Sequence, residues 1–175
     1  LCIIFSMHWI FFSKNSKRQN IFLFCSSLLF YAGWDYRFLS LILFSSVLDY
    51  FVGIAIYNKT HILGKKKLLA LSLAANLGLL FIFKYFNFFI ESFNQFSNII
   101  GFQSNLVLLN IILPVGISFY TFQTLSYTID IFNGKIKPTQ DWIDFATYVC
   151  FFPQLVAGPI ERASRILPQL SQKRS

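Results

Sequence analysis

Long apolar runs, separated by short polar segments, dominate the chain. They occupy residues 1–12, 21–33, 38–57, 68–90 and 106–131. About 20 apolar residues are needed for a helix to cross a bilayer, and several of these runs reach that length. Because hydrocarbon offers the backbone no hydrogen bonds, a spanning run must form a helix. The pattern therefore predicts an all-α protein, a polytopic transmembrane helical bundle.

The polar segments between the runs are of two kinds. Residues 13–20, 58–67 and 133–138 contain lysine or arginine and no acidic residue, whereas residues 91–105 contain neither lysine nor arginine. Cytoplasmic loops of membrane proteins are enriched in basic residues. We therefore expect the first three segments to face the cytoplasm. Residues 91–105 should lie on the opposite side, as a loop with room for a surface helix.

Composition and charge indicate the same class of protein. Hydrophobic residues make up 55% of the chain and aromatic residues 19%, and the mean hydropathy is +0.58. Soluble chains are only about 45–50% apolar. The net charge of +8 comes from the short loops, where basic residues mark membrane topology. We therefore expect a lipid bilayer as the partner of this chain, and no nucleic acid.

Residues 113–130 are apolar overall but carry many polar groups. Pro114 and Gly116 form a Pro-x-Gly element that should kink the helix predicted at residues 106–131. Polar groups in hydrocarbon cost free energy unless they are paired or face a cavity. The helix is therefore predicted to line a cavity. Its candidate lining residues are Tyr120, Gln123, Tyr127 and Asp130.

A second unusual stretch occupies residues 151–162, and it continues an apolar segment that starts at residue 141. Pro153, Gly158 and Pro159 should break any helix that crosses the bilayer here. A spanning helix would also place the basic residues after position 160 outside the cell, against the charge bias. Irregular backbone at membrane depth is tolerated only inside protein or along a cavity. We therefore predict a re-entrant or in-plane helix near residues 141–160, with Thr139 or Asp141 capping its start.

Asp49 lies within the apolar run at residues 38–57. A carboxylate near the middle of a membrane costs about 2.5–3.5 kcal/mol on insertion scales. It should therefore face other helices. A buried structural hydrogen bond is the favoured interpretation, with a functional role as the alternative.

Several of these stretches resemble the membrane-bound O-acyltransferase family, in the branch of alginate O-acetylation and of D-alanyl transfer to teichoic acids. The specific signal comes from PVGISFYTFQ at residues 114–123 and FFPQLVAGPI at residues 151–160. YAGW at residues 31–34, DYFVG at residues 49–53 and KYFNF at residues 84–88 add weaker support.

The resemblance implies an enzyme that moves an acyl group, such as acetyl, from a cytoplasmic thioester through a funnel in the membrane. The donor would be acetyl-CoA or an acyl-carrier protein, and the acceptor a hydroxyl of an exported polysaccharide or carrier. Related systems also use extracytoplasmic acyl-transfer proteins as partners. The implied location is the bacterial cytoplasmic membrane.

The family relies on a histidine in a downstream membrane helix, and neither His8 nor His61 matches that place. The chain also starts without methionine and stops inside a charged segment. We therefore expect residues 1–175 to be one transmembrane domain, the N-terminal part of a longer acyltransferase domain. No catalytic residue is assigned within it.

The sequence also holds no glycine-rich phosphate loop, no cluster of metal ligands and no soluble-type catalytic triad. No metal and no bound cofactor are therefore expected. The candidate funnel-lining residues follow from the two unusual stretches. They are Tyr120, Gln123, Tyr127, Asp130, Pro153, Gln154, Gly158 and Pro159.

Other interpretations stay open from the sequence. The polar residues among these candidates can equally make interhelical hydrogen bonds, worth about 1 kcal/mol each. A transporter or channel subunit would also use a broken helix near the middle of the membrane. A non-catalytic membrane scaffold is a third interpretation. A membrane-embedded histidine downstream would distinguish the enzyme from both.

Overall fold

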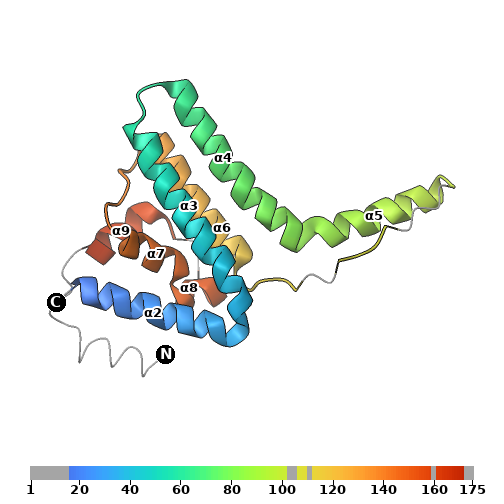
Figure 1. Cartoon of the computed structure of the whole chain (residues 1–175), viewed down its shortest axis with the longest axis horizontal. Helices are drawn as coiled ribbons and strands as arrows, with labels where there is room; N and C mark the ends of the chain where they lie inside the picture. Colours follow the sequence, from blue (N-terminus) through green and yellow to red (C-terminus); the bar gives the residue numbers. More distant parts are fainter. Residues whose placement is uncertain (1–15, 102–105, 110–111, 159–160, 172–175) are drawn as a thin grey trace.

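The computed structural model describes residues 16–101, 106–109, 112–158 and 161–171, and all regular structure in these ranges is helical. Figure 1 shows the arrangement. The longer helices are α2 (Ser16–Asp35), α3 (Leu39–Asn58), α4 (Ile62–Leu80), α5 (Phe86–Ile99) and α6 (Ile117–Phe132). The shorter elements are η1 (Tyr36–Phe38), η2 (Phe81–Tyr85), α7 (Trp142–Cys150), α8 (Phe152–Ala157) and α9 (Ala163–Ser171).

The all-helical prediction is confirmed. Two continuous helical stretches, Ser16–Asn58 and Ile62–Ile99, are long and apolar enough to cross a membrane. The helix predicted at residues 1–12 lies outside the described residues. The short element η1 joins α2 to α3, and the Asp35 carboxylate accepts hydrogen bonds there from the main chain and the guanidinium of Arg37.

Two predicted helix starts are wrong. Helix α2 begins at Ser16 and α4 at Ile62, so residues assigned to polar loops lie inside helices. Lysine and arginine are good helix formers, and neither stretch contains a proline. The composition of a polar segment therefore does not fix the residue at which the next helix begins.

The helix predicted at residues 106–131 is also wrong in its first half. Residues 106–109 and 112–114 are not helical, and α6 begins only at Ile117. Gly116 adopts a left-handed conformation with φ 75°, and the Ile117 N–H donates to the carbonyl of Pro114. The Pro-x-Gly element therefore forms a turn that starts the helix instead of a kink within it.

The segment that starts at residue 141 is broken, as predicted. Helix α7 has nine residues, about 14 Å at 1.5 Å per residue, which is far short of a bilayer core of about 30 Å. The chain bends at Phe151 and continues as α8. The Asp141 side chain caps α7 by accepting a hydrogen bond from the N–H of Ile143, at 2.8 Å, which confirms one of the two predicted caps.

Helices α3 and α6 form the centre of the fold and run side by side (Figure 1). Gly53 allows the close approach, since a Cβ there would lie 2.9 Å from side-chain atoms of Ile131 and Tyr127. Helix α4 packs on the same pair, and α7 packs against both α2 and α3. Helices α7 and α8 are thereby placed beside α6, where the candidate site lies.

Candidate functional site

The four candidate residues on α6 share one face of the helix. Tyr120, Gln123, Tyr127 and Asp130 are spaced by three or four positions, which places them on one stripe. All four are buried. This stripe faces the rest of the described chain.

Helix α8 meets this stripe near its start. The Gln123 amide Nε2 donates to Oε1 of Gln154, at 3.0 Å. The approach is close because a Cβ on Gly116 would lie 3.1 Å from the carbonyl oxygen of Leu155. The structure thus brings together the two motifs that were singled out from the sequence. We call Tyr120, Gln123 and Gln154 the α6–α8 polar site.

Two polar atoms at this site have no partner within the described chain. The hydroxyl of Tyr120 and Oε1 of Gln123 are fully buried and make no hydrogen bond there. Buried polar atoms are nearly always paired, so an unpaired one requires an explanation. Either atom can accept a hydrogen bond, and the hydroxyl can also donate one. The site therefore retains unused hydrogen-bonding capacity for a substrate, a water molecule or another part of the protein.

An apolar hollow lies beside the α6–α8 polar site. It has a volume of about 370 Å³ and is lined by Phe30, Tyr31, Gly33, Trp34, Val115 and Leu155. The Tyr31 hydroxyl, which sequence reasoning missed, donates to the carbonyl of Val115 at 2.7 Å. This bond fixes the end of α2 to the turn that starts α6.

Tyr127 and Asp130 lie further along α6 and make different contacts. The Tyr127 hydroxyl accepts a hydrogen bond from the N–H of Thr139, and its ring lies 4.4 Å from that of Phe145. Asp130 pairs with Lys135 at 3.7 Å near the end of the helix. Both contacts are within the fold. Neither residue reaches the α6–α8 polar site.

The remaining candidates shape α8. Pro153 lies in its first turn, where the missing N–H costs nothing. Gly158 caps its end, and a Cβ there would lie 2.7 Å from the Cα of Gln154. Pro159 is outside the described residues. The two described residues therefore set the length and direction of α8.

Asp49 anchors a separate buried cluster between α3, α4 and α6. Its side chain is fully buried. It accepts hydrogen bonds from the hydroxyl of Ser72, from Nδ2 of Asn76 at 2.8 Å and from the hydroxyl of Thr128 at 3.2 Å. Ser72 and Asn76 gave no signal in the sequence beyond their polarity. This arrangement matches the structural interpretation, because the carboxylate on α3 accepts hydrogen bonds from side chains on both α4 and α6.

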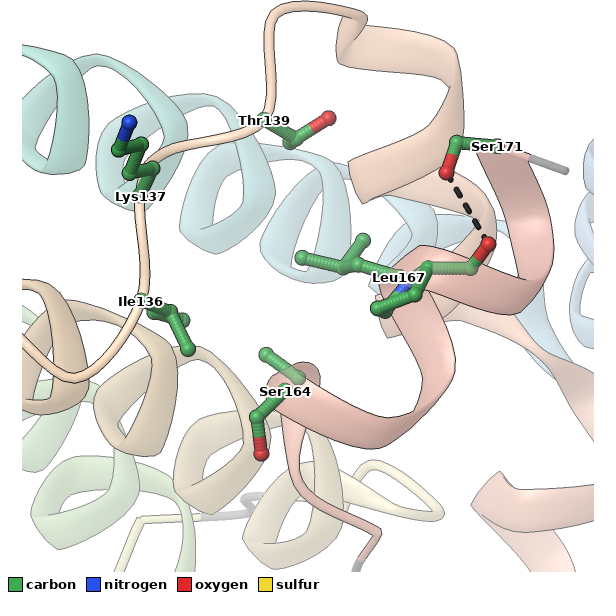
Figure 2. A pocket seen from close by; sticks show the side chains of 8 residues that line it. Ile136, Lys137, Thr139, Ser164, Leu167 and Ser171 are labelled. Atoms are coloured by element: carbon green, nitrogen blue, oxygen red, sulfur yellow. Dashed lines mark hydrogen bonds between the residues drawn. The ribbon is translucent and has the colours of Figure 1, made fainter.

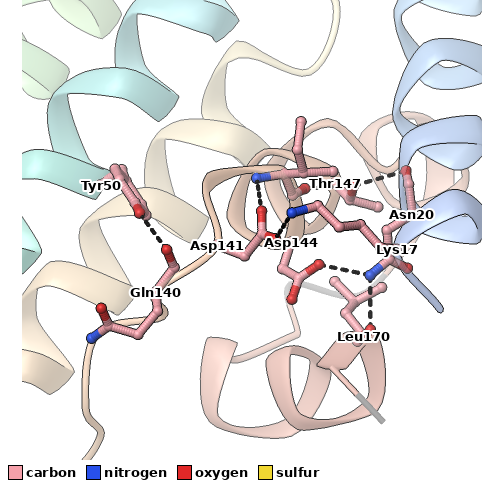
Figure 3. Close-up of polar contacts among 9 residues, drawn as sticks. Lys17, Asn20, Tyr50, Gln140, Asp141, Asp144, Thr147 and Leu170 are labelled. Carbon is pink, nitrogen blue, oxygen red and sulfur yellow. Dashed lines mark hydrogen bonds and ion pairs between the residues drawn. The ribbon is translucent and has the colours of Figure 1, made fainter. Parts of the chain in front are cut away.

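A further polar network joins α2, α7 and α9 (Figure 3). Nδ2 of Asn20 donates to the Asp144 carboxylate at 2.7 Å and to the carbonyl of Leu170 at 2.8 Å. The Thr147 hydroxyl donates to the carbonyl of Asn20 at 3.1 Å. Close by, Lys17 pairs with Asp141 at 3.0 Å. Asn20 sits in a segment that was expected to be a loop, so its role was not predicted.

The Lys17–Asp141 pair predicts a pH effect. Burial raises the pKa of Asp141, but hydrogen bonds from Lys17 and from the N–H of Ile143 outweigh it and lower the pKa below its ordinary 3.8. The charged form is thus favoured by folding, and its contribution is present above pH 3.8 and lost as the pH falls through the lower folded value. Since the pair is partly exposed, we expect the Asp141→Asn variant to be less stable at neutral pH by at most about 1 kcal/mol.

The measurement is the free energy of unfolding in detergent for both proteins. The difference should vanish as the pH falls well below 3.8. A difference that stays constant with pH would show that the ion pair contributes nothing.

A second hollow opens at the same end of the molecule (Figure 2). It has a volume of about 370 Å³ and lies between the segment that follows α6 and helix α9. Ile136, Lys137, Thr139, Ala163, Ser164, Leu167, Pro168 and Ser171 line it. The lining mixes apolar side chains with hydroxyls and one cationic residue.

No metal centre exists within the part of the chain that the structure describes, because no three His, Cys, Asp or Glu residues gather there. His61 is exposed next to the first turn of α4, and His8 lies outside the described ranges. No described residue is therefore assigned as a catalytic base.

Comparison with known proteins gives clear relatives. The chain is 35% identical over 165 residues to the probable alginate O-acetylase AlgI of Pseudomonas aeruginosa, covering 94% of this chain and 32% of that protein. It is 34% identical over 186 residues to the peptidoglycan O-acetyltransferase of Helicobacter pylori, covering 93% of this chain and 34% of that protein. No family model matches the chain, and no solved structure is significantly similar to it.

The relatives are named as O-acetyltransferases, and the two long apolar helical stretches of this chain are consistent with a membrane protein. These relatives confirm the resemblance to the membrane-bound O-acyltransferase family that the sequence motifs indicated. The chain spans about a third of the length of the curated relatives that it matches.

Proposed function

We propose that this chain is part of a membrane-embedded O-acetyltransferase that modifies hydroxyl groups of an exported polysaccharide or another cell-envelope polymer. The observation that carries the proposal is the similarity to named O-acetyltransferases over 94% of the chain. The two acceptors in the relatives' names, alginate and peptidoglycan, are both polymers outside the cytoplasm. The acceptor of this protein is proposed to be of that kind.

The proposed location is the bacterial cytoplasmic membrane, crossed several times. Support comes from the arrangement of charges. The start of α2, the α3–α4 connection with the first turns of α4, the segment after α6, and α9 with the residues just before it lie along the left side of Figure 1, and these parts carry every described basic residue except Arg37 and Lys84. Basic residues concentrate on the cytoplasmic side. Arg37 and Lys84 lie toward the other end.

The proposed reaction is acyl transfer from a thioester to an alcohol. The acceptor hydroxyl attacks the thioester carbonyl, a C–O bond forms, the C–S bond breaks, and the hydroxyl proton ends on the departing thiol. The donor is a cytoplasmic acyl thioester, either acetyl-CoA or an acyl-carrier protein. Extracytoplasmic acyl-transfer proteins are the further partners that we propose.

The α6–α8 polar site would position the reactants rather than remove the proton. Such a reaction needs a base for the hydroxyl and hydrogen-bond donors for the developing oxyanion. Amide and phenol groups at neutral pH are poor bases but good donors and acceptors. The unpaired Tyr120 hydroxyl and the Gln123–Gln154 pair suit the task of orienting a polar group beside an apolar hollow.

This role predicts that Gln154→Ala in the full gene product lowers acyl transfer. Loss of one positioning hydrogen bond, with Gln123 left unpaired, should reduce the rate by about tenfold to a hundredfold. The readout is ester-linked acetate on the exported polymer, normalised to the amount of protein in the membrane. Gln169→Ala, the same change at an exposed position on α9, is the matched control.

The double variant Gln123→Ala/Gln154→Ala tests whether the two glutamines act as a pair or independently. If the two glutamines act together, the double variant should lose little more activity than either single variant. Normal acylation by Gln154→Ala at a normal protein level would exclude the proposed positioning role.

A further inference from the structure

Helix α5 has one apolar face and one polar face. Phe88, Phe89, Phe93, Phe96 and Ile99 fall on one side at 100° per residue, and each is more than half exposed. Asn87, Glu91, Asn94, Gln95 and Asn98 fall on the other side. Among the described elements α5 packs chiefly on η2. Its aromatic face is therefore uncovered by this part of the chain.

The polar face is occupied by the protein's own main chain. The Asn94 side chain donates to the carbonyl of Leu106 at 3.0 Å and accepts from its N–H at 3.2 Å. Asn87 makes the same two bonds with Leu109, at 2.7 and 3.0 Å. Seven helical residues rise about 10.5 Å, and three extended residues span about 10 Å. The two asparagines therefore match the repeat of the extended segment and hold it along α5.

This extended segment cannot lie in open hydrocarbon. Within the described residues, the main-chain N–H and C=O groups of Val107 and Leu108 have no hydrogen-bond partner. The Val107 side chain is 82% exposed. Irregular backbone that faces lipid tails leaves polar groups unsatisfied, at a cost of several kcal/mol each. The polar face of α5 and its attached segment therefore require water or lipid headgroups.

The length of the preceding helix, α4, places α5 at the edge of the bilayer. The start of helix α4 carries Lys65, Lys66 and Lys67, on the predicted cytoplasmic side. From Leu68, just after these lysines, to Lys84 the helical chain rises about 24 Å, which is most of a hydrocarbon core of about 30 Å. At η2 the helix takes π geometry, and α5 leaves in a new direction (Figure 1).

The bend itself has the character of a membrane interface. Lys84 donates to the Ser118 hydroxyl at 3.1 Å, and its ammonium lies 5.4 Å from the ring centre of Tyr85. Lysine beside tyrosine is typical of the level where side chains reach from hydrocarbon to headgroups. Helix α5 alone has 14 residues, about 21 Å, which is too short to cross.

We propose that α5 lies parallel to the membrane plane, at the membrane–water interface on the side opposite the cytoplasm. Its phenylalanine face enters the acyl chains, continuous with the lipid-facing surface of α4, while its asparagine face and residues 106–109 lie among headgroups and water. The partner is the lipid bilayer. In-plane amphipathic helices place their apolar face about 5–10 Å into the boundary of headgroups and chains. The inference rests on membrane insertion and is independent of the proposed enzymatic function.

The test uses the full gene product in lipid vesicles, with its native cysteines replaced by alanine. Single cysteines at positions 88, 91, 93, 95, 96 and 98 are labelled with a nitroxide, which leaves both asparagine contacts intact. A high collision rate between the nitroxide and dissolved oxygen indicates a hydrocarbon environment. A high collision rate with a polar nickel chelate indicates exposure to water. Variants that retain the circular dichroism of the parent protein are compared.

We expect oxygen to dominate at positions 88, 93 and 96 and the nickel chelate at positions 91, 95 and 98. The depth of the nitroxide in the bilayer should alternate with the helical period, and its average should stay the same from one end of α5 to the other. A steady change of depth from 88 to 98 would show a helix that crosses the membrane and overturn the proposal. Low collision with both reagents on the phenylalanine face would show that protein covers it, which would also overturn the proposal.

Discussion

Asp49→Ala is expected to destabilise the protein by at least about 2 kcal/mol. The change removes an acceptor of Ser72, Asn76 and Thr128. The Thr128 hydroxyl keeps the Thr124 carbonyl as an acceptor, but the Ser72 hydroxyl and one N–H of Asn76 lose theirs, and each buried donor left unpaired costs about 1–3 kcal/mol. Because the three partners come from α4 and α6, the loss should loosen the contact between three helices. The measurement is the free energy of unfolding in mixed detergent, followed by circular dichroism.

Two controls accompany this experiment. Asp49→Asn keeps the shape and one acceptor oxygen, so it should lose distinctly less stability than the alanine variant. Asp35→Ala removes a carboxylate of the same type from the turn after α2, where it pairs with the largely exposed Arg37 and accepts from the Arg37 N–H. This change should cost much less than Asp49→Ala, since only one capping hydrogen bond and one exposed ion pair are lost. Wild-type stability of Asp49→Ala would show that the buried cluster does not hold the bundle together.

Gly116→Val is expected to have the largest effect on activity, a loss of about a hundredfold. A Cβ at this position would lie 3.1 Å from the Leu155 carbonyl oxygen, so α8 must move away from α6. That movement separates Gln154 from Gln123. Displacement of a positioning group by about 1 Å can reduce a rate by about a hundredfold.

Gly134→Val is the matched control for backbone strain. Gly134 has φ 72°, close to the 75° of Gly116, but a Cβ on Gly134 would meet no other atom within 4 Å. Both variants carry the left-handed penalty of about 1–2 kcal/mol. Only Gly116→Val should also lose ester-linked acetate on the polymer per membrane protein. Equal losses in the two variants would show that the α6–α8 contact has no special role.

The sequence predicted the class of fold well because its signal is strong and local. Apolar runs of spanning length leave few alternatives to helices, and proline with glycine reliably breaks the stretch after Cys150. The start of α6 was harder. A proline inside an apolar run is compatible with both a kink and a turn, and the left-handed Gly116 decides for the turn.

The candidate site was only partly predictable, for a different reason. Polarity within apolar runs pointed to Gln123 and Gln154, and these two side chains do meet. The same rule pointed to Tyr127, whose hydroxyl is used by the main chain of Thr139. Which polar side chains satisfy each other depends on how helices distant in sequence pack, and Asn20 shows that a residue within an expected loop can join three helices.

The most direct test of the central claim is the amount of ester-linked acetate on polymers outside the cell. It should be compared in the parent strain, a strain lacking the complete gene, and that strain carrying the gene on a plasmid. We predict that ester-linked acetate falls sharply in the deletion strain, with the amount of exported polymer maintained, and returns on complementation. Unchanged acetylation, or a loss of the exported polymer itself with its degree of acetylation preserved, would contradict the assignment as an O-acyltransferase.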